Sequence, residues 1–157
     1  MKPGLHDIFE RYRTHRWLFL APGGNWGEQL IYRGAESLAG KIGLEWTDID
    51  LHELKEIELG REDCIYLHGS GGFNSWCSGR AFDTLGAALF QRVGLVVQGP
   101  QTAEDSLSFL ERRLAPILRT REAREVVFFA REEVTEANLR RVLGNAPGPF
   151  PSVSGVR

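Results

Sequence analysis

The sequence has few cysteines, no long apolar run and no excess of charge of one sign. Its two cysteines among 157 residues exclude a disulfide framework and fit a reducing compartment, so we expect a cytoplasmic protein. No apolar stretch approaches the roughly 20 residues of a membrane span, and the polar residues 1–13 are unlike a secretory signal. A formal net charge of −2 favours neither nucleic acid nor an anionic membrane as a partner. What remains is an ordinary folded domain, since 42% of the residues are hydrophobic.

Short apolar runs alternate with helical patterns along residues 1–144. Apolar residues at helical spacing predict a helix over residues 4–14 and further helices after the runs. The predicted strands are 17–20, 45–49, 64–68, 94–98 and 126–129. This alternation predicts βαβ units, and therefore an α/β, Rossmann-like domain with a parallel sheet and helices on both faces.

Turn and cap residues divide the C-terminal third of the chain. Thr102, with Asp105 at the capping-box position, is a predicted N-cap of one helix, and Thr135 is the predicted N-cap of the last. A hydrophobic staple between Val134 and Leu139 fits the second of these starts. Residues 145–157 are rich in Pro and Gly and lack periodicity, so we expect a linker or disordered tail.

The unusual polar and glycine-rich stretches follow the strands. They are residues 21–28, 68–76 and 98–102. In parallel α/β sheets ligands bind beyond the carboxyl ends of the strands, so we expect one ligand cleft lined by all three.

The first stretch passes directly from a strand into a helix. Its adjacent glycines and the free N–H groups of a helix start would suit a phosphate or carboxylate, although a tight turn explains them equally well. Pro22 stands where a dinucleotide fingerprint requires its first Gly. Asp48 or Asp50 lies at about the separation of a ribose-binding acid, so a nicotinamide-dependent oxidoreductase half remains a less favoured alternative.

The second stretch begins at His68, which is a candidate acid or base near neutral pH, or equally a structural residue. No G-x-S-x-G motif occurs, so serine hydrolysis is not predicted. Cys64 and His68 lie four positions apart on a strand, roughly 13 Å, too far to share one ion. We therefore expect no metal site.

The third stretch and the end of the last predicted strand offer further polar groups. The amides of Gln98 and Gln101 could hydrogen-bond a sugar, and Arg131 could bring a cation to the same edge. A plain helix start capped by Thr102 is the alternative interpretation.

Four motifs, in order, resemble the N-terminal half of the polysaccharide pyruvyl transferase family. They are residues 24–31 (GNWGEQLI), 67–74 (LHGSGGFN), 96–102 (VVQGPQT) and 128–135 (FFAREEVT). Trp26 and Glu28 replace the commoner Phe and Asp of the first motif, and Ser70 interrupts the Gly run of the second.

The resemblance implies transfer of a pyruvyl group from phosphoenolpyruvate to a sugar of a cell-surface polysaccharide, usually as a ketal, without a further cofactor. It also implies that this Rossmann-like domain is one half of a GT-B-like arrangement. The second family domain is absent from the sequence, so we expect the chain to be incomplete alone, or to use a partner chain. A non-catalytic sugar- or nucleotide-binding module is the alternative from another functional class.

The loops and the resemblance together nominate site residues of two kinds. The candidate catalytic residues are Glu28 and His68. The candidate substrate-binding residues are Gly23, Gly24, Asn25, Gly27, Ser70, Gly71, Gly72, Phe73, Asn74, Gln98, Gln101, Thr102 and Arg131.

Overall fold

The computed structural model describes residues 3–23, 26–144 and 152–155. Over these ranges, helices and strands alternate along the chain. The helices are α1 (Leu5–Arg11), α2 (Trp26–Ile42), α3 (Leu51–Glu56), α4 (Arg80–Leu89), α5 (Leu107–Arg119) and α6 (Glu133–Leu143). The strands are β1 (Arg16–Leu20), β2 (Trp46–Ile49), β3 (Asp63–Leu67), β4 (Leu95–Gln101), β5 (Glu125–Ala130) and β6 (Ser152–Gly155).

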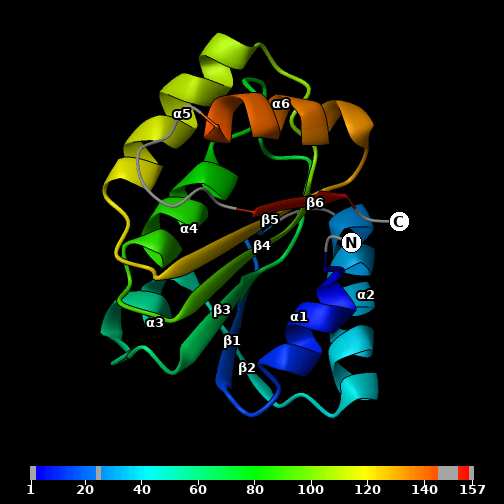
Figure 1. The fold of residues 1–157 in the computed structure, drawn as a ribbon, viewed down its shortest axis with the longest axis vertical. Helices are drawn as coiled ribbons and strands as arrows, with labels where there is room; N and C mark the ends of the chain where they lie inside the picture. The colour runs from blue at the N-terminus through cyan, green and yellow to red at the C-terminus, as the bar shows by residue number, and fades with distance from the viewer. Residues whose placement is uncertain (1–2, 24–25, 145–151, 156–157) are drawn as a thin grey trace.

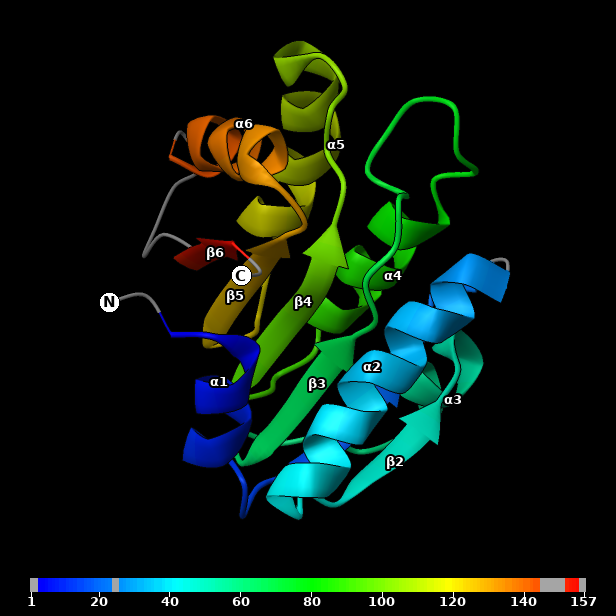
Figure 2. The same ribbon diagram turned by 90° about the vertical axis from the view of Figure 1, so that its right-hand side faces the viewer.

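The strands form one sheet in the order β2-β1-β3-β4-β5-β6, with every neighbouring pair parallel (Figures 1 and 2). The predicted α/β, Rossmann-like class is therefore confirmed. The chain leaves β1 for β2 on one side and returns to β3 on the other. This reversal at the carboxyl ends of β1 and β3 is the crevice where doubly wound sheets bind their ligands.

Helices cover both faces of the sheet (Figure 1). One face packs against α1 and α2 through an aromatic cluster that includes Phe9, Trp17, Phe19 and Tyr66. The opposite face packs against α3, α4, α5 and α6 through mainly aliphatic side chains. The central strands are buried on both sides, which explains their nearly continuous apolar runs. None of the helices in the described ranges is both long and apolar enough to cross a membrane.

The predicted helix caps are wrong by a few residues. Helix α5 begins at Leu107, and its N-cap is Ser106, whose Oγ accepts the Phe109 N–H at 3.3 Å. Thr102 lies upstream of this cap, because β4 extends to Gln101. Four residues then separate Thr102 from the first residue of α5.

The start of α6 differs in the same way. Glu132 is its N-cap and accepts the N–H groups of Val134 and Thr135. Thr135 lies inside the first turn, where its buried Oγ1 accepts the Ala103 N–H at 2.8 Å. Val134 lies inside the helix, after the cap, and not before it as a hydrophobic staple requires, so the predicted staple is wrong.

Two elements were not predicted. The tail expectation is wrong for residues 152–155, which pair with β5 as the parallel edge strand β6; the rest of 145–157 lies outside the described residues. Strand β6 adds backbone hydrogen bonds to a free sheet edge, so it needs little apolar content. Helix α3 is short, but Asp50 caps it and forms a capping box with Glu53.

Candidate functional site

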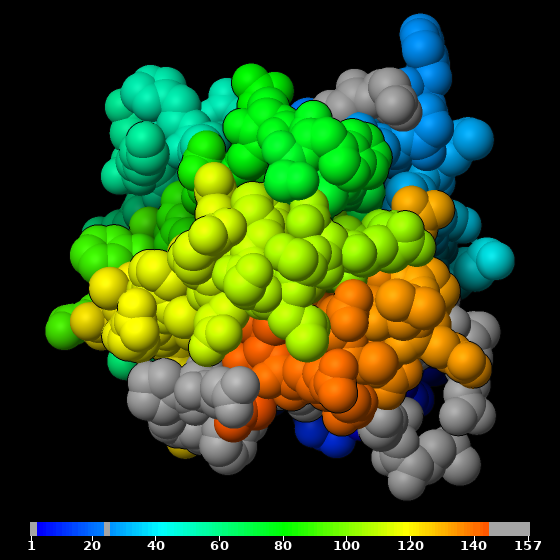
Figure 3. All heavy atoms as spheres, turned by 90° about the horizontal axis from the view of Figure 1, so that it is seen from above, coloured from blue at the N-terminus to red at the C-terminus, as the bar shows by residue number. Residues whose placement is uncertain are grey.

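An open cavity of about 240 Å³ lies at the carboxyl ends of β1 and β3, where the chain reverses. Three segments line it: the loop after β1 with the start of α2, the loop after β3, and the start of α4. The lining residues are Pro22, Gly23, Glu28, Ser70, Gly72, Cys77, Ser78, Arg80 and Ala81. Figure 3 looks onto this edge of the molecule, with the green loop after β3 near the blue start of α2. The first and second predicted ligand stretches therefore meet at one site.

The Arg80 guanidinium is the cation of this cavity. Arg80 is the first residue of α4, directly after Gly79, whose φ of 78° favours glycine. Its side chain passes so close to Gly23 that a Cβ there would lie 2.6 Å from Arg80 Nη1. The absence of a side chain at Gly23 thus leaves room for the Arg80 guanidinium beside the backbone. A guanidinium in this position can bind a carboxylate or phosphate.

Sequence reasoning chose Arg131 as the cation and overlooked Arg80. Arg131 follows β5, and it does not line the cavity. The available signal for Arg80 was its place at the first helical position after a glycine-rich loop. That signal is weak, because many surface arginines begin helices.

Glu28 is the predicted catalytic residue that reaches the cavity. It is half-buried on the first turn of α2, and its charge contributes to raising the pKa of Tyr32 to about 12, although burial is the larger cause. Gly23 also lines the cavity, and Gly27 adjoins Glu28 on the exposed side of α2. Gly24 and Asn25 were predicted as well, but they lie outside the described residues.

Ser70 and Gln101 form a buried network that shapes the loop after β3. Ser70 Oγ donates to Gln101 Oε1 at 3.1 Å, and the Gly72 N–H donates to both of these oxygens at 3.2 Å. Gln101 Nε2 is buried without a hydrogen-bond partner. Ser70 and Gly72 remain at the cavity wall, whereas the Gln101 oxygen is engaged inside the loop.

Asn74 and Phe73 also act within this loop. The Asn74 amide donates to the Gly71 carbonyl, and its oxygen accepts the Cys77 N–H at 2.9 Å. Phe73 is buried and stacks on Phe82 of α4, with 4.8 Å between ring centroids. These predicted substrate-binding side chains fix the loop instead of lining the cavity.

The remaining predicted residues join the ends of β3, β4 and β5. Gln98 is buried and donates to the Gly99 carbonyl at 3.2 Å. The Thr102 N–H donates to the Ser70 carbonyl at 3.2 Å, and the Arg131 N–H donates to the Gln101 carbonyl at 3.1 Å. None of these three side chains lines the cavity.

His68 lies on the other side of the loop, under α2. It is 3% exposed and packs against the rings of Tyr32, Phe19 and Tyr66, at 4.5, 5.6 and 5.2 Å between centroids. Burial lowers the pKa of His68 to about 4, so the imidazole is neutral at physiological pH. A neutral, buried imidazole outside the cavity is poorly suited to the predicted role of general acid.

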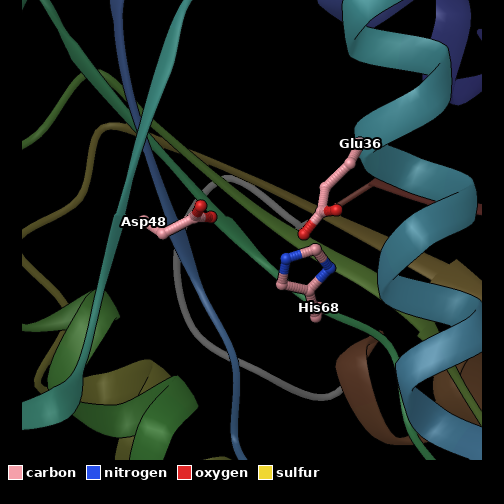
Figure 4. A group of neighbouring side chains, drawn as sticks. All are labelled: Glu36, Asp48 and His68. Carbon is pink, nitrogen blue, oxygen red and sulfur yellow. The ribbon is translucent and has the colours of Figure 1, made fainter.

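The two acids considered for ribose binding serve different purposes. Asp50 is occupied as the N-cap of α3, where it accepts the N–H groups of His52 and Glu53 at 2.8 Å. Asp48 instead lies close to Glu36 and His68 on the α2 face of the sheet (Figure 4). No sequence pattern connects these three residues, since they come from three separate elements.

A second hollow, of about 470 Å³, lies at the opposite edge, where β3 and β5 begin. Arg61, Arg121 and Arg124 line it, and Arg61 Nη1 donates to the Glu122 carbonyl at 2.7 Å. None of the predicted motifs reaches this hollow. Ligands of parallel sheets bind at the carboxyl edge, so we take the smaller cavity as the candidate site despite its size.

Comparison with protein-family models gives no match, and comparison with curated proteins gives none either. The candidate site is therefore defined by its geometry: a cavity at the β1–β3 reversal that holds one carboxylate, one guanidinium and a glycine-rich loop.

Proposed function

We propose that this chain is a polysaccharide pyruvyl transferase-like domain, which helps to move a pyruvyl group from phosphoenolpyruvate to a sugar of a cell-surface polysaccharide. One observation carries the proposal. The first two motifs of the family resemblance, distant in sequence, supply the walls of a single cavity that contains Glu28 and Arg80. An acid and a cation that line the same cavity suit a ligand that has both hydroxyl groups and a carboxylate.

The chemistry requires few protein groups. A proton adds to the methylene carbon of phosphoenolpyruvate, and C2 becomes an oxocarbenium ion. One sugar hydroxyl bonds to C2 and loses its proton; phosphate then leaves with the electrons of its C–O bond, and a second hydroxyl takes its place. The balance is one ketal and one inorganic phosphate for each donor and diol.

Glu28 and Arg80 have separate roles in this scheme. The Glu28 carboxylate accepts the proton of the attacking hydroxyl and orients it. The Arg80 guanidinium binds the pyruvyl carboxylate, a charge-assisted contact that fixes C2 above the hydroxyl groups.

Two exposed tryptophans flank the segments that line the cavity. Trp26 is 90% exposed at the start of α2, and Trp76 is 82% exposed in the loop after β3, next to Cys77. Large aromatic surfaces at the rim of a polar cavity offer a platform for the apolar face of a sugar ring. Their position supports a carbohydrate as the ligand.

The proposal assigns this chain one half of a GT-B-like pair. Cationic groups for the donor phosphate would come from a second domain or a partner chain. Phosphoenolpyruvate is a cytoplasmic metabolite, and the low cysteine content agrees with that compartment.

The test is calorimetric binding of a methyl hexoside that carries a pyruvate ketal, compared with the same hexoside without it. We expect the ketal to bind more tightly, and Arg80→Gln to weaken its binding about tenfold or more while leaving the plain hexoside unchanged. Arg92→Gln is the matched control, because Arg92 is also an exposed arginine but lies outside the cavity, with Glu122 at 3.7 Å.

Three results would contradict the proposal. Equal affinity for the two hexosides would indicate a sugar-binding module without pyruvyl recognition. Tight binding of a nicotinamide dinucleotide would favour the oxidoreductase alternative. An Arg80→Gln chain that binds the ketal like the wild type would remove the assigned role of Arg80.

A further inference from the structure

Three ligand-type side chains converge on the face of the sheet covered by α2. They are Glu36 on α2, Asp48 on β2 and His68 directly after β3, and one ligand atom from each lies within 4.8 Å of the others. Figure 4 shows the His68 ring near the two carboxylates, in the space between α2 and the sheet.

The pairing of the strands explains this convergence. Phe19 of β1 is paired with Asp48 on one side and Tyr66 on the other, so all three side chains leave the same face of the sheet. His68 is two residues beyond Tyr66 and returns to that face. Helix α2 crosses above it and brings Glu36 from the opposite side. Each member is therefore set by regular secondary structure.

The His68 ring provides a second observation beside the geometry of the cluster. Its side chain is more than nine-tenths buried, and its Nδ1 has no hydrogen-bond partner. Buried polar atoms in folded proteins almost always have one, because an unmet group loses its hydration without compensation. The rings of Tyr32 and Phe19 pack against the imidazole. This packing holds the His68 side chain in one orientation, as suits a metal ligand.

We propose that Glu36, Asp48 and His68 bind one divalent metal cation, and that Zn²⁺ binds there more tightly than Mn²⁺ or Mg²⁺. Two carboxylates and one neutral imidazole carry a charge of −2, which matches the ion. An imidazole donor favours Zn²⁺ over Mg²⁺ and Ca²⁺, which prefer oxygen alone, and Mn²⁺ binds such mixed sites more weakly than Zn²⁺. This inference rests on the cluster and not on the proposed function.

The geometry needs only a small adjustment to close around an ion. Ligand atoms about 2 Å from Zn²⁺ lie about 3–4 Å apart, slightly less than the present limit of 4.8 Å. Asp48 is exposed on the edge strand β2 and can rotate inward. Arg33, at 3.3 Å from Glu36, is the competing partner that the ion must displace. Three protein ligands leave at least one position for water.

The test is titration of the metal-stripped chain with Zn²⁺, Mn²⁺ and Mg²⁺ by calorimetry. We expect one Zn²⁺ per chain, weaker Mn²⁺ binding and the weakest binding of Mg²⁺. Asp48→Asn and Glu36→Gln should each weaken Zn²⁺ binding at least tenfold. Asp48 is exposed, so Asp48→Asn is expected to fold normally even if replacement of buried His68 does not.

The matched control is His52→Gln, because His52 and Glu56 form an exposed pair at 3.5 Å that could hold Zn²⁺ weakly on the surface. It should leave the tight site unchanged. A nitrogen NMR spectrum of the imidazoles should show the His68 signal moving at one equivalent of Zn²⁺.

Wild-type affinity in Asp48→Asn and Glu36→Gln would overturn the proposal. So would an affinity lost in His52→Gln, or an absence of Zn²⁺ binding at millimolar concentration.

Discussion

At the scale of single residues, Gly69 marks a close approach between the loop after β3 and the backbone of β4. A Cβ at Gly69 would contact the Pro100 carbonyl oxygen and lie 2.8 Å from Pro100 N and 2.9 Å from its carbonyl carbon. Backbone atoms cannot move aside as a side-chain end can. The loop after β3 and the end of β4 are therefore held at a spacing that glycine alone allows.

We expect Gly69→Ala to lower the free energy of unfolding by about 1–3 kcal/mol, since the new methyl must push the β4 backbone away. Urea unfolding monitored by circular dichroism measures this change. Gly71→Ala is the control, because no atom beyond its immediate chain neighbours lies within 4 Å of a Cβ there. Equal stability of the two variants would contradict the close approach.

Asp63 forms the clearest ion pair of the sheet. Arg16 donates from Nε to Oδ1 and from Nη2 to Oδ2 of Asp63, both at 2.8 Å, and the Gly60 N–H also donates to Oδ2. The hydrogen bonds from Arg16 are the main cause that lowers the pKa of Asp63 below its model-peptide value of 3.8. The pair ties the first residue of β1 to the first residue of β3.

The pH dependence of this pair follows from the direction of the shift. A carboxyl with a lowered pKa in the folded state adds stability above its unfolded pKa of 3.8, and loses it as the pH falls through the folded pKa. We expect Asp63→Asn to cost about 1–2 kcal/mol at pH 7, since Arg16 is half exposed and partly screened. Denaturant unfolding at pH 7 and pH 2.5 should show the difference shrinking in acid, whereas Glu62→Gln, at an exposed neighbour, should change little at either pH.

Residue type alone misled the site prediction at several positions. Ser70, Asn74 and Gln101 have side chains that bind sugars in many proteins, but here their hydrogen bonds fold the loop after β3. Whether a polar side chain faces a ligand or its own backbone depends on the loop conformation, which sequence patterns do not determine.

At the scale of single elements, helix α5 begins several residues after the N-cap that the sequence pattern predicts. Thr102 followed by Asp105 has the spacing of a capping box, but Ser106 is the cap and Asp105 accepts the Ser75 N–H at 2.6 Å. Asp105 therefore anchors the loop that borders the cavity.

Replacement of the true cap should cost stability and that of the expected cap should not. We expect Ser106→Ala to lower the free energy of unfolding by about 1 kcal/mol, because the Phe109 N–H loses its acceptor. Thr102→Ala should cost less, since the hydrogen bond from Thr102 to the Ser70 carbonyl comes from the backbone N–H, which alanine keeps. The midpoint of thermal unfolding compares the two, and a larger loss in Thr102→Ala would reverse this assignment.

Strands with continuous apolar runs were predictable, and elements without them were not. The runs at residues 17–20 and 126–129 are buried on both faces, which is the environment that such composition indicates. Strand β6 has the sequence SVSG, with one apolar residue, and depends on the exposed edge of β5 for its pairing. Helix α3 was detectable by its capping box, from Asp50 to Glu53, although not by periodicity.

At the scale of the whole molecule, the alternation of elements determined the fold class but not the strand order. The reversal between β1 and β3, which creates the cavity, depends on pairing across a large part of the chain. The cluster of Glu36, Asp48 and His68 depends on the same pairing together with the position of α2. Sites assembled from three elements therefore emerge only when the sheet order is known.

The pairing of β1 with β3 also bears on how quickly the chain can fold. Arg16 and Asp63 are 47 positions apart, so β1 cannot pair with β3 until that long segment has closed into a loop. Loop closure lowers the entropy of the chain before any stabilising contacts between the strands have formed. Parallel sheets fold slowly for this reason. Until closure, the apolar strands stay uncovered, and during that interval the protein is most exposed to aggregation.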